Sequence, residues 1–169
     1  MRGKVDVAFR RRKVQARHHL YVFDQGTLVA VLPAGHRLAA RKEVLPHDIA
    51  AETYITPTRV APVLKSIIDA YAAKVGITLK PQYESETLAS SMSLVASTGG
   101  VSLQPLFAQN LVSSGVVIRP LQGKPPTIDL VMGYNRSNTS ALLKRFLSRA
   151  DELVERVSRT QGSRLFAAQ

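Results

Sequence analysis

The feature that most constrains the fold is an uninterrupted apolar run, LVAVL at residues 28–32, which ends at Pro33. A half-buried strand alternates apolar and polar residues, so a short run without alternation is typical of a strand that is buried on both faces. Such a strand needs helices on both sides of its sheet. The run therefore predicts an α/β domain with a parallel or mixed sheet.

Helical and strand patterns alternate along the rest of the chain. Apolar side chains recur at helical spacing over residues 60–75, and Gly76 follows where a left-handed residue commonly ends a helix. Because helices separate most of the strands, we expect a mainly parallel sheet. Other helices are predicted at residues 46–50 and 86–97, and a last helix extends from the capping residues 138–140 to residue 157. A charged loop is expected at residues 10–13, and residues 24–26 are expected to break a strand. The predicted strands are residues 5–9, 20–23, 28–32, 53–56, 77–83, 101–103, 116–118 and 128–132.

Length and composition exclude several classes of protein. The chain has 169 residues, enough for one compact unit or for two lobes that share a core, and it has no cysteine. The lack of cysteine excludes disulfides, a thiol nucleophile and cysteine-rich metal centres. No apolar run approaches the ~20 residues that span a bilayer, and the N-terminus lacks the apolar stretch of a signal peptide. We therefore expect a cytoplasmic protein without a membrane partner.

The net charge of +11 is concentrated near the two ends of the chain. Residues 1–19 hold seven basic side chains and one acidic one, residues 136–169 hold seven and three, and the stretch between them holds nine and eight. A nucleic acid, an anionic ligand or a solvated surface could each explain this distribution. Aromatic residues make up only 6% and do not interleave with the basic clusters, so direct nucleic-acid binding is not favoured.

Catalytic and metal-binding patterns are weak. The sequence has no nucleophile-elbow, phosphate-loop or dinucleotide-binding motif. His18 and His19 are neighbours, and neighbouring side chains of a strand face opposite sides, so the pair cannot hold one metal. His36 is expected in a solvated turn and His47 beside a helix start. We expect no metal, no cofactor and no catalytic residue.

One loop has the features of an anion site. Thr56, Pro57 and Thr58 join a predicted strand to the start of the helix at residues 60–75. Hydroxyls and free backbone amides at a helix start suit a carboxylate. An ordinary helix cap with a proline-shaped entry explains the same residues equally well.

Two other segments lie where a ligand could bind. Gly99, Gly100 and Val101 follow a predicted helix, and their alternative interpretation is a helix cap that leads into a strand. Phe9 and Arg10 lie at the end of the first predicted strand, where it passes into the charged loop. An arginine there could bind a carboxylate through two hydrogen bonds, whereas a charged, solvated turn fits residues 11–13 better.

Four stretches, in this order, resemble the effector-binding domain of LysR-type transcriptional regulators. The second and third together carry most of the specificity, and the resemblance is collinear over residues 3–150. The stretches are GKVDVAF at residues 3–9, LVAVLPAGHRLA at 28–39, SLVASTGGVSLQP at 93–105 and LLKRFL at 142–147.

The resemblance implies a fold similar to that of periplasmic binding proteins, with two Rossmann-like subdomains joined by two crossover strands. Residues 26–126 would form subdomain II, and residues 1–25 and 127–169 would belong to subdomain I, which would then hold both basic ends. A small organic or aromatic acid would bind in the cleft between the subdomains. The residues that the resemblance places near this ligand are Phe9, Arg10, Thr56, Pro57, Thr58, Gly99, Gly100 and Val101.

The sequence departs from the family at its N-terminus. Nothing here matches the winged helix-turn-helix and linker helix, or the opening β-α-β portion of subdomain I. We therefore expect an N-terminally truncated regulator with an incomplete first subdomain, which would contact DNA only through a helix-turn-helix domain absent from this chain. Bare sheet edges would favour a homo-oligomer or pairing with intact relatives.

The expected function is that of a non-catalytic, ligand-sensing regulatory domain whose effector is small and anionic. In such a domain, effector binding favours one arrangement of the two lobes. The free energy of this coupling equals the difference between the effector's binding free energies for the two arrangements. One alternative is a solute-binding protein of a transport system, which would need an export signal. Another is an enzyme of similar fold, such as a deaminase of small metabolites, but the sequence shows no convincing catalytic pair.

Overall fold

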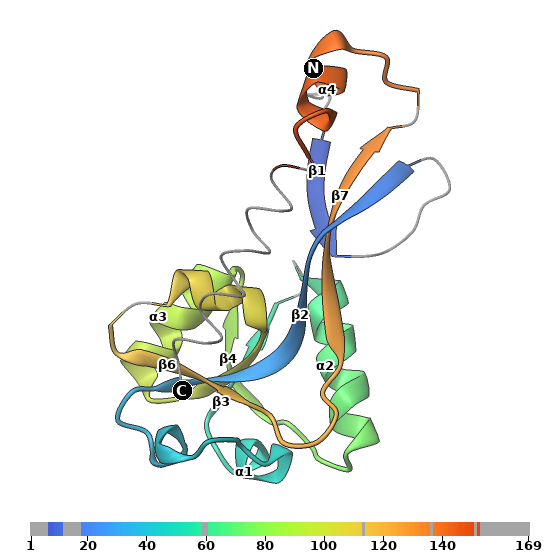
Figure 1. Cartoon of the computed structure of the whole chain (residues 1–169). Helices are drawn as coiled ribbons and strands as arrows, with labels where there is room; N and C mark the ends of the chain where they lie inside the picture. Colours follow the sequence, from blue (N-terminus) through green and yellow to red (C-terminus); the bar gives the residue numbers. More distant parts are fainter. Residues whose placement is uncertain are drawn as a thin grey trace. The chain divides into compact units, whose positions relative to one another are not determined.

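The computed structural model describes residues 7–11, 18–58, 61–112, 114–135, 137–150 and 152. The chain divides into two compact units: unit 1 combines Met1–Gln25 with Asp129–Gln169, and unit 2 is Gly26–Ile128. Two strands, β2 (His18–Pro33) and β7 (Thr127–Asn135), each run from one unit into the other (Figure 1).

Unit 2 contains a mixed sheet in which the strand order is β2-β5-β3-β4, with β6 paired to β2. Strand β3 is parallel to both of its neighbours, whereas β2 is antiparallel to β5 and to β6. The expectation of a mainly parallel sheet is therefore wrong for β2, since only the strands joined through helices α2 and α3 follow the parallel arrangement. The strands are β3 (Tyr54–Pro57), β4 (Pro81–Ser85), β5 (Val101–Pro105) and β6 (Val116–Pro120).

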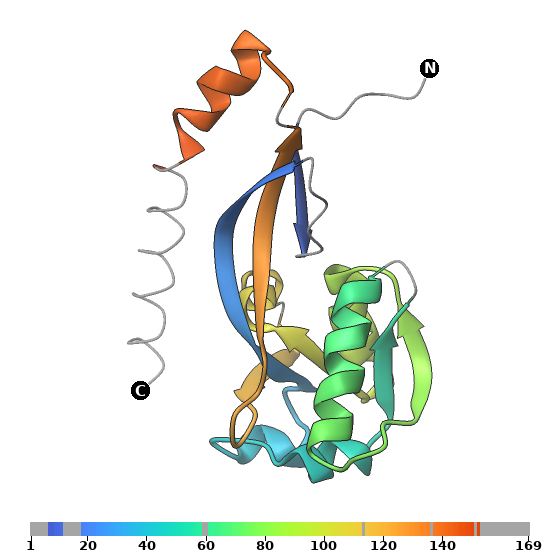
Figure 2. The same ribbon diagram turned by 90° about the vertical axis from the view of Figure 1, so that its right-hand side faces the viewer.

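Two helices, α2 (Pro62–Lys74) and α3 (Leu88–Thr98), cover opposite faces of this sheet (Figures 1 and 2). Successive strand residues point to opposite faces, so Tyr54 packs in the cluster that contains Ile68 of α2, and Ile55 packs in the cluster that contains Val95 of α3. The central run at residues 28–32 is at most 3% exposed. The prediction of a strand covered on both faces is confirmed.

Strand β2 is longer than the sequence pattern predicted. Residues 24–26 were expected to break it, but the strand is continuous over 16 residues. Gly26 is buried within it, and a Cβ there would lie 3.1 Å from the backbone nitrogen of Leu106. The glycine therefore allows a second segment of backbone to approach closely, and it does not form a turn.

The predicted helices of unit 2 are confirmed within a few residues. Gly76 has the left-handed φ of +72°, and Gly99 has +75° after α3. Strand β4 begins only at Pro81, four residues later than predicted, and forms the edge of the sheet, where a missing amide costs no ladder bond. The short elements are the 3-10 helices η1 (Arg37–Ala40) and η2 (Leu106–Leu111) and the helix α1 (Pro46–Ala50).

Unit 1 contains strand β1 (Val7–Arg11), which pairs antiparallel with β7. Arg10 and Arg11 were expected in a loop and instead lie in this strand. Helix α4 (Ala141–Leu147) follows, with Leu143 buried. The rest of the predicted C-terminal helix, at residues 153–157, lies outside the described residues.

Candidate functional site

The carboxyl ends of the parallel strands define the candidate site of unit 2. Pro57 at the end of β3 lies opposite Ser85 at the end of β4. In sheets of this kind, ligands bind beyond the carboxyl ends of the strands, beside helix starts. Because α2 follows β3 and α3 follows β4, both helices begin near this edge.

Hydrogen bonds fasten the ends of β3 and β4 to each other. The Thr58 amide donates to the Ser85 carbonyl at 2.9 Å, and the Ser85 hydroxyl donates to the Thr56 carbonyl at 3.5 Å. Thr56 and Ser85 are buried, 5% and 3% exposed. The edge is therefore a fixed polar surface, which suits selective recognition of a small molecule.

The interpretation of residues 56–58 as an ordinary helix cap does not hold. Helix α2 starts at Pro62, and its cap residue Ala61 makes no side-chain cap hydrogen bond. Thr58 instead accepts a hydrogen bond from the Ala61 amide at 3.0 Å through its carbonyl, which turns the chain toward the helix.

Helix α3 begins with a capping box. The Thr87 hydroxyl accepts from the Ser90 amide at 3.0 Å, and the Ser90 hydroxyl accepts from the Thr87 amide at 2.9 Å. Two amides of the first turn are thereby satisfied. The capping box therefore fixes the start of α3 beside the end of β4.

A buried polar network lies between α3 and the strands. The Ser102 hydroxyl donates to the Ile55 carbonyl at 3.1 Å and accepts from the Ser91 hydroxyl at 3.1 Å. The side-chain nitrogen of Gln104 donates to the hydroxyls of Ser91 and Ser102, at 2.9 and 3.0 Å. The Gln104 side-chain oxygen is buried and has no partner among the described residues. Sequence reasoning missed this network. Its signal was the spacing of two polar residues, 102 and 104, on one face of an otherwise apolar strand.

Gly99, Gly100 and Val101 lie at the other end of the sheet. Val101 pairs with Tyr54, the first residue of β3, so these residues precede β5 at its amino end. The three-residue rise along β3 separates the two ends by about 10 Å. Within unit 2 the structure does not bring these residues together with Thr56, because a parallel strand places its two ends at opposite edges.

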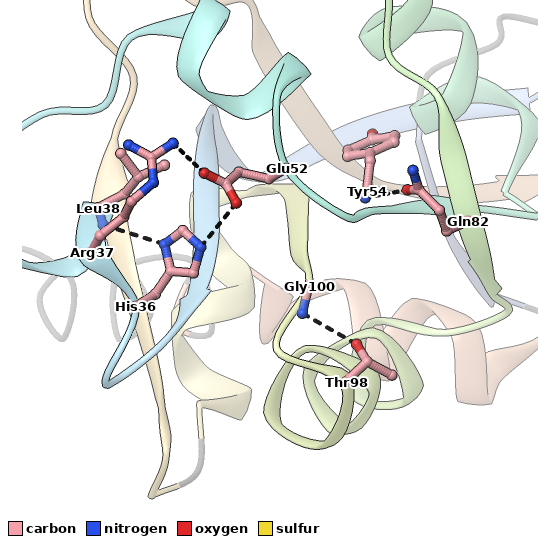
Figure 3. Close-up of polar contacts among 8 residues, drawn as sticks. All are labelled: His36, Arg37, Leu38, Glu52, Tyr54, Gln82, Thr98 and Gly100. Carbon is pink, nitrogen blue, oxygen red and sulfur yellow. Dashed lines mark hydrogen bonds and ion pairs between the residues drawn. The ribbon is translucent and has the colours of Figure 1, made fainter.

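The role that the structure gives to Gly99 and Gly100 is local. Gly99 ends α3, and a Cβ on Gly100 would lie 2.9 Å from the Thr53 carbonyl oxygen. The Gly100 amide donates to the Thr98 hydroxyl at 3.2 Å (Figure 3). The helix-cap interpretation of this segment is confirmed, and its contact with a ligand stays a prediction.

Phe9 and Arg10 occupy strand positions in unit 1. Phe9 pairs with Met132 and Arg10 with Val131 of β7. The structure describes their backbone pairing only. That Arg10 binds a carboxylate therefore remains a prediction.

His36 does not lie in a solvated turn as expected. Its side chain is 12% exposed, its Nδ1 accepts from the Leu38 amide at 3.2 Å, and its Nε2 lies 3.3 Å from a carboxylate oxygen of Glu52 (Figure 3). Arg37 pairs with the other oxygen of Glu52. Since Nδ1 accepts, Nε2 carries the proton that is donated to Glu52. The cluster fastens η1 to the segment before β3.

Within the described ranges, no three His, Asp or Glu side chains converge to form a metal site. None of the helices described there has both the length and the apolar character needed to cross a bilayer. The carboxyl ends of β3 and β4, beside the starts of α2 and α3, lie where α/β sheets of this kind bind ligands.

Comparison with known proteins identifies the family. A model described as the LysR substrate binding domain matches residues 1–154, and the chain belongs to this family. The Hca operon transcriptional activator HcaR of Escherichia coli K12 is 28% identical over 160 residues, covering 93% of this chain and 54% of that protein. The chain thus spans about half the length of this curated relative.

Two solved structures show the same fold. The effector-binding domain of a BenM variant has a TM-score of 0.73 at 18% identity, with 94% of this chain and 73% of that chain covered. The effector-binding domain of QuiR in complex with shikimate has a TM-score of 0.71 at 19% identity, with 92% and 72% covered. The resemblance and the periplasmic-binding-protein-like fold are confirmed. The matches are to regulatory domains, which argues against the transport-protein alternative.

Proposed function

We propose that this chain senses a small anionic organic effector and passes the signal to transcription without catalysing a reaction. The observation that carries this proposal is the match of the LysR substrate-binding domain family to residues 1–154. The Thr56 hydroxyl at the carboxyl edge supports it, because a fixed hydroxyl can donate a hydrogen bond to a carboxylate.

The effector class rests on two further points. QuiR holds shikimate, a small hydroxylated carboxylic acid, in its effector-binding domain. In this chain Thr56, Pro57 and Thr58 lie at the carboxyl edge, where two helices begin and where helix dipoles favour an anion. The proposal keeps Phe9, Arg10, Gly99, Gly100 and Val101 as contacts on the family resemblance alone.

We propose the same family organisation for the rest of the molecule. Unit 2, Gly26–Ile128, would be subdomain II, which the sequence predicts at residues 26–126. Unit 1 would belong to subdomain I, predicted at residues 1–25 and 127–169. DNA would be contacted through the helix-turn-helix domain of the family. The chain would act in the cytoplasm, as a homo-oligomer or paired with other members of the family.

Isothermal titration with small organic acids, shikimate among them, tests the proposal. We expect at least one acid to bind and Thr56→Val to weaken its binding by about 1–3 kcal/mol, through loss of a hydrogen bond to a charged group. Ser93→Ala is the matched control, because this exposed hydroxyl on α3 donates only to the Ala89 carbonyl. A chain that folds but binds none of the acids would disprove sensing, and equal affinities of Thr56→Val and wild type would remove Thr56 from the site.

A further inference from the structure

The peptide groups on both sides of Thr56 are each bound by a buried serine hydroxyl. Ser102 of β5 donates to the Ile55 carbonyl at 3.1 Å, and this carbonyl lies in the same peptide plane as the Thr56 amide. Ser85 of β4 donates to the Thr56 carbonyl at 3.5 Å. The bond from Ser102 is the shorter of the two. The orientation of Thr56 in β3 therefore depends on a side chain of the neighbouring strand β5.

The hydrogen of the Ser102 hydroxyl has a single direction. A carbonyl only accepts, so the bond to Ile55 uses the one hydrogen that a serine hydroxyl carries. The Ser102 oxygen can then only accept, and Ser91 donates its own hydrogen to it at 3.1 Å. The Ser91 oxygen also accepts, and the donor to both serines is the side-chain nitrogen of Gln104, at 2.9 and 3.0 Å. We call this one-way series of bonds, from Gln104 to the Ile55 carbonyl, the Ser102 network.

The side-chain oxygen of Gln104 agrees with this direction. Only an amide nitrogen turned toward the two serines can begin the series of donors, so the oxygen must point away from them. That oxygen is buried and has no partner among the described residues. A buried acceptor without a partner costs free energy. The fold thus carries this cost at one end of the network, while both serine hydroxyls and the Ile55 carbonyl are satisfied.

The Ser102 network also attaches α3 to the strand that leads to Thr56. Ser91 follows directly after the capping box that begins α3. Ser91, Ser102 and Gln104 are at most 1% exposed, so water does not compete for their bonds. Hydrogen bonds depend on direction, whereas the apolar contacts around them do not. The network therefore sets the position of the α3 start relative to Thr56.

We propose that Ser102 is a positioning residue of the effector site. Its hydroxyl, oriented by Ser91 and Gln104, holds the peptide group before Thr56, so that the Thr56 side chain keeps one direction at the carboxyl edge. This inference rests on the proposed function, because that function assigns Thr56 to the effector. Ser102 is fully buried and does not itself contact the effector. Its contribution to binding is made through Thr56 and disappears when Thr56 no longer binds.

Isothermal titration of the full chain with shikimate and with benzoate tests the proposal in a double-mutant cycle. Ser102→Ala should weaken binding about fivefold when Thr56 is present, because Thr56 loses its fixed direction. In the Thr56→Val background the same change should have less than about a twofold effect, since the residue through which Ser102 acts is already removed. A role of Ser102 in folding alone would change the affinity equally in both backgrounds, and that result overturns the proposal.

Val116→Ala is the matched control for lost stability. Val116 of β6 is 4% exposed and belongs to the apolar cluster under α3, but it is not part of the Ser102 network. Strands β2 and β5 separate β6 from β3. Val116→Ala should destabilise the fold and keep the affinity within about twofold of wild type, because the two sites share no partner. The proposal is overturned if Val116→Ala weakens binding as much as Ser102→Ala, or if Ser102→Ala binds as tightly as wild type.

A second measurement does not need the effector. Three-bond NMR couplings to the Thr56 methyl carbon report whether this side chain occupies one rotamer. We expect one rotamer in wild type and in Val116→Ala, and averaging between rotamers in Ser102→Ala. If neither acid binds the wild-type chain, the proposed function fails for both acids while the rotamers still decide the role of Ser102. Averaging in Ser102→Ala then supports the proposal, and an unchanged single rotamer overturns it.

Discussion

The two faces of the unit 2 sheet are built on different principles. The face under α2 is packed with apolar side chains such as Leu64, Ile68 and Leu103, whereas the face under α3 contains the hydrogen-bonded group Ser91, Ser102 and Gln104. Apolar packing stabilises in proportion to buried area and is tolerant of direction, whereas hydrogen bonds fix relative positions. The comparison teaches that the larger apolar cluster lies under α2, while the face under α3 combines a smaller apolar cluster with hydrogen bonds that hold α3 in a defined position.

The largest expected effect is on the α2 face. Ile68→Ala should lower the free energy of unfolding by about 2–5 kcal/mol, because a side chain that is 1% exposed leaves a cavity. Urea denaturation measures it. Ile67→Ala is the neighbouring control and should cost less, since Ile67 is only partly buried. Equal losses of unfolding free energy at both positions would mean that α2 buries Ile67 as deeply as Ile68, contrary to the structure.

A smaller loss is expected on the α3 face. Ser102→Ala should cost about 1–3 kcal/mol, because it leaves Ser91, the Gln104 amide and the Ile55 carbonyl without one of their partners. Thermal and urea unfolding give the value. Gln104→Met provides the comparison, because it also removes the buried oxygen that has no partner and should therefore cost less than Ser102→Ala. The reverse order would show that the network does not centre on Ser102.

The smallest effect is a pH dependence on the α2 face. Burial, and secondarily the Asp69 carboxylate, raises the pKa of Tyr54 above the value of 10.0 for a free phenol. Below pH 10 the phenol is neutral in both the folded and the unfolded chain, so its contribution to the free energy of unfolding is fully present. Above pH 10 the unfolded chain ionises first, so stability should fall by about 1.4 kcal/mol per pH unit.

Unfolding free energies measured from pH 9 to 11 check this expectation. Tyr54→Phe should flatten the decline relative to wild type, and Tyr83→Phe, at an exposed position, should leave it unchanged. A decline of the same slope in Tyr54→Phe would assign it to other groups, such as the buried Tyr71 phenol, whose pKa burial also raises.

Local patterns determined much of this protein. The apolar run at residues 28–32, the helical spacing at residues 60–75 and the glycines at 76 and 99 predicted buried strand, helix and caps, because each depends on residues near in sequence. The order of motifs was also sufficient to indicate the family, and the family match confirms it.

Only the tertiary structure decided which ends of the strands meet. β5 pairs with both β2 and β3, so residues far apart in sequence become neighbours through long-range pairing that no local pattern encodes. This pairing places Gly99 to Val101 away from Thr56, makes Gly26 a point of close backbone approach and joins Ser91 to Gln104.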